Sequence, residues 1–191
     1  MTTTLEARLA DMHVAASISL VRAAAENVTL LAPTADAAPE VRGKRALLQW
    51  LVAMAPGIVP VPEATAWYLQ HAPTATPSAA ALLVDACYAG MVDLHVHPPT
   101  LASRSSARPQ ASAIVRWQVA RQASVTNLRH ETLRIDDPLA RQLLAVLDGT
   151  RAVDDLVALV ADTLPMAERD TAAARVTTYL SHFTLHALLD A

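Results

Sequence analysis

Two pairs of histidines have spacings that metal sites use. His182 and His186 stand four residues apart in a predicted helix, the spacing of the two zinc ligands in a His-Glu-x-x-His motif. Phe183 occupies the position of that motif's general-base glutamate, and the sequence places no third ligand. His95 and His97 alternate on a predicted strand and share one face, but two ligands do not make a site. We therefore predict no metal site.

The sequence also lacks the patterns of nucleotide and acyl-transfer sites. Its four glycines are Gly43, Gly57, Gly90 and Gly149. A phosphate-binding loop needs two or three glycines within about six residues, and a nucleophile elbow needs glycines on both sides of a serine. The acidic pairs at 136–137 and 154–155 stand at predicted helix starts, where the helix dipole favours negative charge. We predict no catalytic and no cofactor-binding residue in this chain.

A basic segment is the strongest candidate for binding. Between Leu101 and Arg134 there are six arginines, no lysine and a single acidic residue, Glu131, so the net charge of this stretch is +5. The arginines are Arg104, Arg108, Arg116, Arg121, Arg129 and Arg134. Such a stretch can hold an acidic protein surface or phosphates, and Trp117 is its only aromatic residue. The alternative is a solvated linker and strand face.

The composition describes a folded chain with no global preference for nucleic acid or membranes. It has 191 residues, of which 53% are hydrophobic and only 4% aromatic, so Ala, Leu and Val must form closely packed helices. The net charge is −3. The single cysteine, Cys87, cannot form an internal disulfide, which favours a reducing compartment. With no signal peptide or long apolar run recognised, we expect a cytoplasmic protein without membrane insertion.

The spacing of apolar residues predicts the secondary structure. Helices are expected over residues 5–26, 42–55, 62–71, 78–88, 113–123, 139–147, 153–164 and 167–189. Strands are expected over residues 28–31, 58–61, 91–97 and, as one or two strands, 125–135. Ala152 stands where a serine or threonine would pair best with Asp155, so the helix over 153–164 is expected to have a weak N-terminal cap.

These elements predict a mainly α fold with short strands, in two tandem winged-helix-like units. Residues 42–97 contain three helices followed by a strand, the order of a winged-helix unit. The expected organisation is an N-terminal helix and loop over residues 1–41, a first winged-helix-like unit over 42–99, a basic linker over 100–124 and a second unit over 125–191. The second unit shows no obvious wing at its end.

Several short blocks follow from neither helix nor strand periodicity. In order, they are AGMVDLHVHPP at 89–99, RP at 108–109, VTNLRH at 125–130, IDDPLAR at 135–141, LDGTR at 147–151 and LHALL at 185–189. Their order and spacing over about residues 42–191 resemble the C-terminal regulatory region of bacterial class I methyltransferases of the protein-lysine methyltransferase type. VTNLRH and LDGTR together carry most of this resemblance, since LDGTR alone also occurs in small peptide-binding winged-helix domains.

The resemblance implies a regulatory role rather than a catalytic one. In the family, an N-terminal Rossmann-like domain binds S-adenosylmethionine, and no such domain precedes residue 42 here. Residues 1–41 resemble the tail of the family's middle regulatory region. S-adenosylmethionine would therefore belong to a full-length relative or a partner. The resemblance implies a non-catalytic regulatory or substrate-recognition module that binds a methyltransferase catalytic domain or a polypeptide substrate.

We predict that this partner docks on the strand edge at 125–135 and on the basic segment. The arginines would pair with acidic groups, and Trp117 would be the apolar anchor. The predicted partner-binding residues are Arg116, Trp117, Arg121, Asn127, Arg129, His130 and Arg134.

The main alternative is a DNA-binding winged-helix regulator, which would need a basic recognition helix. The predicted helix over 78–88 contains no Arg or Lys and one acid, Asp85, and the helix over 153–164 is acidic. Two further alternatives are an active methyltransferase with an unrecognised cofactor site and a fragment without a present function.

Overall fold

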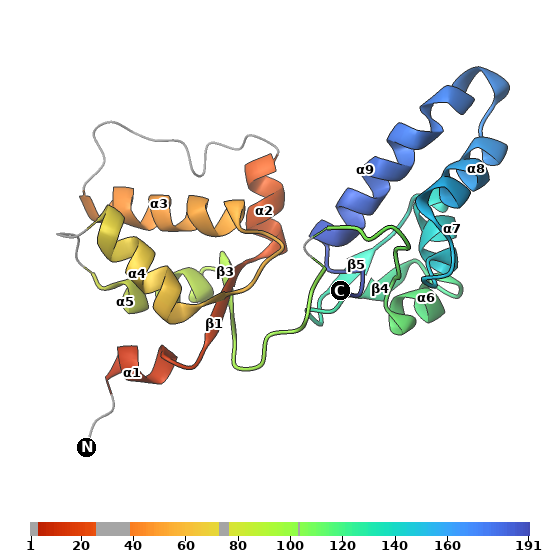
Figure 1. Ribbon diagram of the computed structural model, residues 1–191. Coiled ribbons are helices and arrows are strands. Elements are labelled where there is room, and N and C mark those ends of the chain that lie inside the picture. Colours follow the sequence, from red (N-terminus) through yellow and green to blue (C-terminus); the bar gives the residue numbers. More distant parts are fainter. Residues whose placement is uncertain (1–3, 26–38, 73–76, 103) are drawn as a thin grey trace. The chain divides into compact units, whose positions relative to one another are not determined.

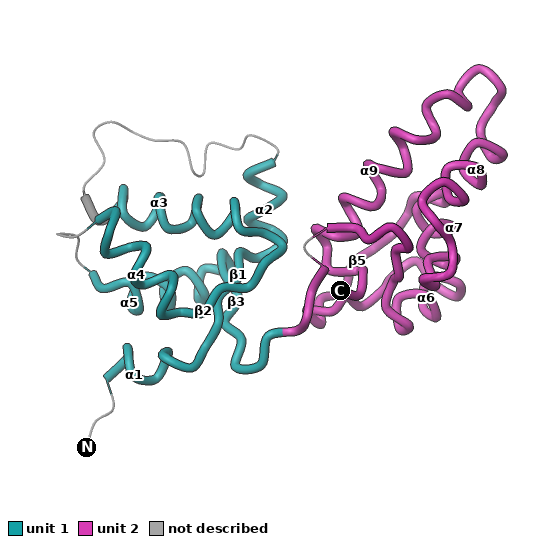
Figure 2. The backbone as a smooth tube through the Cα atoms, viewed as in Figure 1, with its two compact units in different colours: residues 1–98 teal, residues 99–191 magenta. Residues whose placement is uncertain are grey.

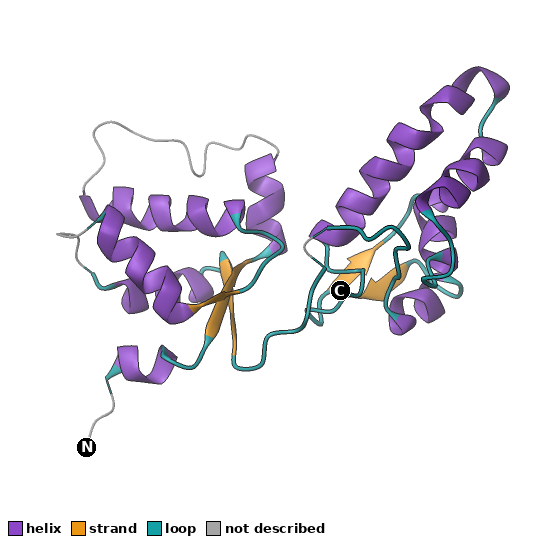
Figure 3. Cartoon of the chain, in the orientation of Figure 1, coloured by secondary structure: helices purple, strands orange, loops and turns teal. Residues whose placement is uncertain are grey.

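The computed structural model describes residues 4–25, 39–72, 77–102 and 104–191. The chain divides into two compact units, residues 1–98 and 99–191 (Figures 1 and 2). Helices dominate both units and the strands are short (Figure 3), so the predicted mainly α fold class is confirmed.

The first unit is built around a small antiparallel sheet. Its strands are β1 (His13–Ala16), β2 (Val59–Pro60) and β3 (Val92–His95), in the order β2-β1-β3. Its helices are α1 (Leu5–Leu9), α2 (Ile18–Ala25), α3 (Pro39–Ala53), α4 (Val61–His71) and α5 (Ala79–Tyr88). The elements α3, β2, α4, α5 and β3 follow one another in the chain, and the central strand β1 precedes all of them.

The prediction of one continuous helix over residues 5–26 is wrong. The segment is divided into α1, β1 and α2 because Val14, Ala15 and Ala16 are buried in the centre of the sheet. Strand pairing on both sides outweighs the helix preference of the alanines. Residues 1–41, expected to lie outside the first unit, thus supply its central strand. The strand predicted over 28–31 lies outside the described residues.

The second unit begins with a helix and a hairpin and continues as a bundle. Its elements are α6 (Ala113–Val119), β4 (Ser124–Thr126), β5 (Thr132–Arg134), α7 (Pro138–Val146), α8 (Val153–Thr163), a 3-10 helix, η2 (Met166–Thr171), and α9 (Ala172–Leu185). β4 and β5 pair antiparallel, and Leu143, Leu144 and Leu156 lie at the centre of the core.

Two boundaries in the second unit differ from the expectation. The segment 100–124, expected to be a linker, belongs to the second unit: the helix predicted over 113–123 forms as α6, and its Val115 and Val119 are buried in the core of this unit. The helix predicted over 167–189 begins as the 3-10 helix and ends at Leu185. The chain then turns through Ala187, whose φ is 53°, and the N–H of Ser112 donates to the carbonyl of Leu188. This pairing ties the two ends of the unit together.

Candidate protein-interaction surface

The arginines of the predicted basic segment do not form a single patch. Arg108 donates to a backbone carbonyl of the 148–151 turn, and Arg116 Nε donates to the carbonyl of Ala111 at 3.1 Å. The side chain of Arg129 is buried, with only 8% of the residue exposed. Arg108 and Arg116 are thus engaged by backbone carbonyls of their own unit and Arg129 is buried, so not every arginine of the segment is available to a partner.

One exposed surface does combine an aromatic residue with an arginine, and we call Ile114, Trp117 and Arg121 the α6 patch. Ile114 is 50% exposed and Trp117 58%. The guanidinium carbon of Arg121 lies 4.5 Å from the Trp117 ring centre, and Arg121 also donates to the Trp117 carbonyl at 2.9 Å. Because Val115 and Val119 turn inward, helical spacing places Ile114 and Trp117 on the outer face of α6, and Arg121 follows just after the helix.

The helix that carries the α6 patch is firmly held. The hydroxyl of Ser112 caps its N-terminus by accepting from the N–H of Val115 at 3.3 Å. Arg141 on α7 donates to the carbonyl of Val119 at its other end, at 3.0 Å. A capped helix anchored at both ends presents an exposed indole at low cost in conformational entropy.

Asn127, a predicted partner-binding residue, instead organises the turn of the β4–β5 hairpin. It is 2% exposed. Its Oδ1 accepts from the backbone N–H groups of Arg129 and Glu131, both at 2.9 Å. Its Nδ2 donates to the Glu131 carboxylate at 2.7 Å and to the carbonyl of His186 at 3.0 Å. These contacts explain why an asparagine stands in the VTNLRH block without invoking a partner.

The remaining predicted residues lie on the exposed side of the same hairpin. His130 is exposed in the turn, with φ at 63°. Arg134 on β5 forms an ion pair with Asp136 at 2.7 Å. On β4, the N–H of Thr126 donates to the side chain of Gln118 at 2.6 Å, so this part of the predicted docking edge is occupied within the unit.

The LDGTR block forms a tight structural turn between α7 and α8. The carboxylate of Asp148 accepts from the hydroxyl of Thr150 at 2.6 Å and from its N–H at 3.0 Å. These hydrogen bonds, the hydroxyl one first, lower the pKa of Asp148. Gly149 has φ at +82°, and a Cβ there would lie 2.8 Å from the Gln110 side chain. The turn therefore requires a glycine and positions the start of α8.

The weak cap of α8 is visible in the hydrogen bonds. Ala152, at the N-cap, forms no side-chain hydrogen bond to the helix, whereas the Asp155 carboxylate accepts from the Ala152 N–H at 2.9 Å. Only one half of the reciprocal pair is therefore formed.

In neither pair do both histidines lie in the helix or strand that their sequence spacing predicted. His186 follows the end of α9 as its C-cap, and His97 lies beyond the end of β3. His95 instead stands opposite His13 of β1, a neighbour that the sequence could not show while residues 5–26 were expected to be helical. Among the described residues, no group of three or more His, Cys, Asp or Glu side chains is placed to hold a metal ion.

The described residues do not fit S-adenosylmethionine as the Rossmann-like fold binds it. That fold needs a parallel sheet and a glycine-rich turn at a helix N-terminus. Every strand pair that the structure describes is antiparallel. Gly149 lies against Gln110, and a Cβ at Gly43 would lie 3.1 Å from the Tyr68 ring, so both glycines serve internal packing.

Comparison with known proteins finds a family match within the second unit. Residues 107–188 match the family described as "PKMT, C-terminal winged helix domain". Similar solved structures include PKMT2 from Rickettsia typhi, with a TM-score of 0.61 and 15% identity, and PKMT2 from Rickettsia typhi in complex with AdoHcy, with 0.59 and 13%. Each similarity covers 78% of this chain and 34% of the other, so the chain spans about a third of their length.

These structural similarities establish a shared fold. No significantly similar sequence was found among curated proteins. No helix in the described part of the chain is long and apolar enough to cross a membrane.

Proposed function

We propose that this chain, whose residues 107–188 are a winged-helix region of the PKMT C-terminal type, is a non-catalytic regulatory or substrate-recognition module. It would bind a methyltransferase catalytic domain or a polypeptide substrate. The family match covers a winged-helix region, and the strand pairs of the described residues are antiparallel, unlike the parallel sheet of a Rossmann-like cofactor domain. Catalysis would therefore reside in a partner or in a full-length relative, in the cytoplasm.

The α6 patch is the observation that supports this proposal most directly. Tryptophan and arginine are the residues most often found at energetic centres of protein interfaces. Here Arg121 stacks on an indole that is more than half exposed, beside an exposed isoleucine. An apolar side chain flanked by a carboxylate would complement both parts of the patch, so the favoured partner is an acidic, partly apolar polypeptide segment.

Titration with a peptide tests this function. The probe is an acetylated, amidated peptide with a central leucine and phenylalanine flanked by glutamates, and the readout is the indole N–H signal of Trp117 in NMR spectra. We expect this signal to shift. Trp117→Ala lacks this signal, so its affinity is measured by isothermal titration; it should be about thirtyfold weaker, since a central interface aromatic contributes about 2 kcal/mol or more.

Tyr88 provides a matched control because it is an aromatic residue on the other unit with 89% exposure. Tyr88→Ala should leave peptide affinity unchanged. Loss of binding in both variants, or an unshifted Trp117 signal at saturating peptide, would contradict the proposal.

Two further ligands distinguish the alternatives. Duplex DNA that binds with a steep salt dependence, and equally well to Trp117→Ala, would favour the DNA-binding regulator. Heat released on titration with S-adenosylmethionine would favour an active methyltransferase, and we expect none.

A further inference from the structure

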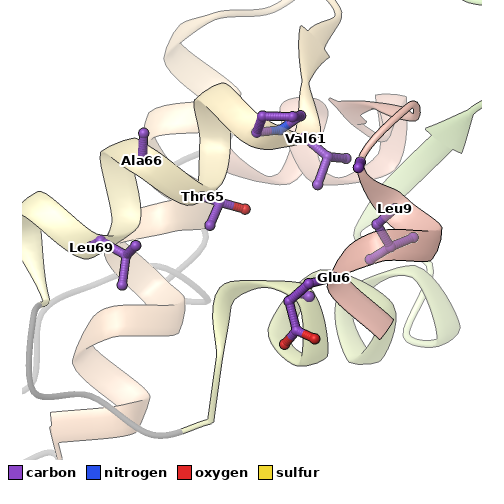
Figure 4. A pocket seen from close by; sticks show the side chains of 9 residues that line it. Glu6, Leu9, Val61, Thr65, Ala66 and Leu69 are labelled. Atoms are coloured by element: carbon purple, nitrogen blue, oxygen red, sulfur yellow. The ribbon is translucent and has the colours of Figure 1, made fainter. Parts of the chain in front are cut away.

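The first unit contains an open groove that the proposed function does not use. It has a volume of about 370 Å3 and lies between α1 and α4, with α5 contributing Ala80 (Figure 4). Glu6 and Leu9 line it from α1, and Val61, Thr65 and Leu69 line it from α4. This volume falls in the range of sites that bind small ligands and side chains.

The groove exists because α4 has two apolar faces and only one of them is covered. Val61, Ala64 and Tyr68 are buried, and of these three Val61 also lines the groove. Pro62, Ala66 and Leu69, spaced at i, i+4 and i+7, form a second apolar stripe, and Leu69 is 55% exposed. α1 packs on α5, which leaves this stripe open to a ligand.

Glu6 gives the groove its chemical selectivity. It alone is charged among the nine described residues that line the groove. The hydroxyl of Ser78 donates to Glu6 Oε1 at 3.1 Å, and the same hydroxyl accepts from the N–H of Ala81 as the N-cap of α5. Ser78 therefore holds one oxygen of the carboxylate at the groove, and no residue in the described ranges donates a hydrogen bond to the other oxygen.

We propose that this groove binds a lysine or arginine side chain presented by a polypeptide segment. These side chains have an apolar stem and a cationic end, and they place the stem on apolar surface while the end meets a charge or water. The stem would lie along the stripe of α4, and the cation would donate to Glu6. An anionic ligand would be repelled by the carboxylate, and the net negative charge of the first unit acts in the same direction.

This inference concerns the first unit alone and does not depend on the α6 patch. The groove and the patch would select opposite charges, so binding at one site is separable from binding at the other.

The test uses the full chain with isotope-labelled leucine and valine methyl groups. The probes are an acetylated, amidated hexapeptide of alanine and leucine with one central lysine, and the same peptide with Nε-acetyl-lysine. We expect the lysine peptide to shift the methyl signals of Leu9, Val61 and Leu69. It should bind about fivefold more tightly than the acetyl-lysine peptide, because only the free ammonium forms a charge-assisted hydrogen bond.

Glu6→Gln should abolish this fivefold preference, and Glu63→Gln should retain it. Glu63 is a suitable control because it is exposed in the first turn of α4 and does not line the groove. Thermal unfolding of each variant establishes that it is folded. Leu69→Ala, on the exposed stripe, should weaken both peptides by a similar factor and keep their ratio, which provides a second test if Glu6→Gln disturbs α1.

Three results would overturn the proposal. The first is equal binding of the two peptides to the unmodified chain. The second is retention of the lysine preference by a folded Glu6→Gln variant. The third is a set of peptide-induced shifts that excludes the three groove methyl groups.

Discussion

The two units share a plan and expose opposite chemistry. In each, a short helix and at least one strand precede the helices of the core: α1 and β1 in the first unit, α6 and the β4–β5 hairpin in the second. The first unit has five basic and eight acidic residues, whereas the second has ten of each. The first presents a carboxylate in an apolar groove, and the second presents an arginine on an exposed indole.

The difference between the leading helices shows how packing creates a binding surface. The five-residue α1 packs on α5 and leaves the second stripe of α4 uncovered, which produces a groove. The seven-residue α6 buries Val115 and Val119 and is anchored at both ends, which leaves an exposed patch on its outer face. The first helix of each unit thus creates a different surface: the short α1 leaves a groove beside it, and the anchored α6 carries an exposed patch.

The largest expected effects concern the independence of the two units. Leu83 in the first core and Leu144 in the second are both fully buried. Replacing either by alanine should lower the free energy of unfolding of its own unit by about 2–5 kcal/mol, through lost burial and the cavity left behind. Thermal unfolding can be followed by the NMR indole signals of Trp50 and Trp67 for the first unit and of Trp117 for the second. If the signals of both units were lost at the same temperature in either variant, the two units would not unfold independently.

A smaller but substantial effect is expected at the β4–β5 hairpin of the second unit. Asn127→Ala removes four hydrogen bonds made by a buried amide, and we expect a loss of about 2–3 kcal/mol in the free energy of unfolding. Chemical denaturation measures this loss. Thr132→Ala, at an exposed position of the same hairpin, should change stability by less than about 0.5 kcal/mol. A fully stable Asn127→Ala variant that fails to bind the acidic peptide would instead support the partner-binding role predicted from the sequence.

The sequence predicted most of the helices because their apolar periodicity and end signals agree. Pro62 in the first turn of α4 and Asp137 before α7 act as expected, with the Asp137 carboxylate accepting from the N–H of Leu139 at 2.9 Å. The resemblance to the C-terminal region of protein-lysine methyltransferases is confirmed over residues 107–188. Apolar periodicity and end residues are sufficient to predict an element whose stability depends mainly on residues within that element.

Features that depend on distant partners were not predictable. β1 is alanine-rich and becomes a strand only because β2 and β3, more than 40 residues away, pair with it. Charge counting also could not show that Arg129 is buried and that Arg116 donates to a backbone carbonyl while Arg121 remains at the surface. The sequence did offer one sign of the α6 patch: Ile114 and Trp117 are three residues apart and therefore lie on one face of the predicted helix.

A modest pH effect is expected where α9 of the second unit meets the start of α7. The hydroxyl of Tyr179 on α9 donates to the Asp137 carboxylate, and partial burial together with this hydrogen bond raises the pKa of Tyr179 to about 12. The unfolded chain loses this proton near the ordinary tyrosine pKa of 10.0, so the stabilisation is fully present below pH 10 and is lost as the pH rises toward 12. Solvent screening limits the contribution to about 1 kcal/mol or less.

Ultraviolet difference absorbance during an alkaline titration measures this pKa directly. The difference between the unmodified chain and Tyr179→Phe isolates the Tyr179 signal. Ionisation of this signal at the ordinary tyrosine pKa would contradict the proposed link between α9 and the start of α7.

The smallest expected effect separates Arg134 from Arg121, two arginines that the sequence alone treats as equivalent. The Arg134–Asp136 pair is exposed, with 72% and 68% of the two side chains accessible, so Arg134→Ala should change the free energy of unfolding by less than about 0.5 kcal/mol. It should also leave the affinity for the acidic peptide unchanged, because Asp136 already neutralises this guanidinium.

Arg121→Ala should be equally stable but bind the peptide several-fold more weakly, since Arg121 has no carboxylate partner among the described residues and stacks on Trp117. Isothermal titration of both variants measures this difference. Equal losses would mean that the second unit recognises its partner by the summed charge of the segment rather than by the α6 patch.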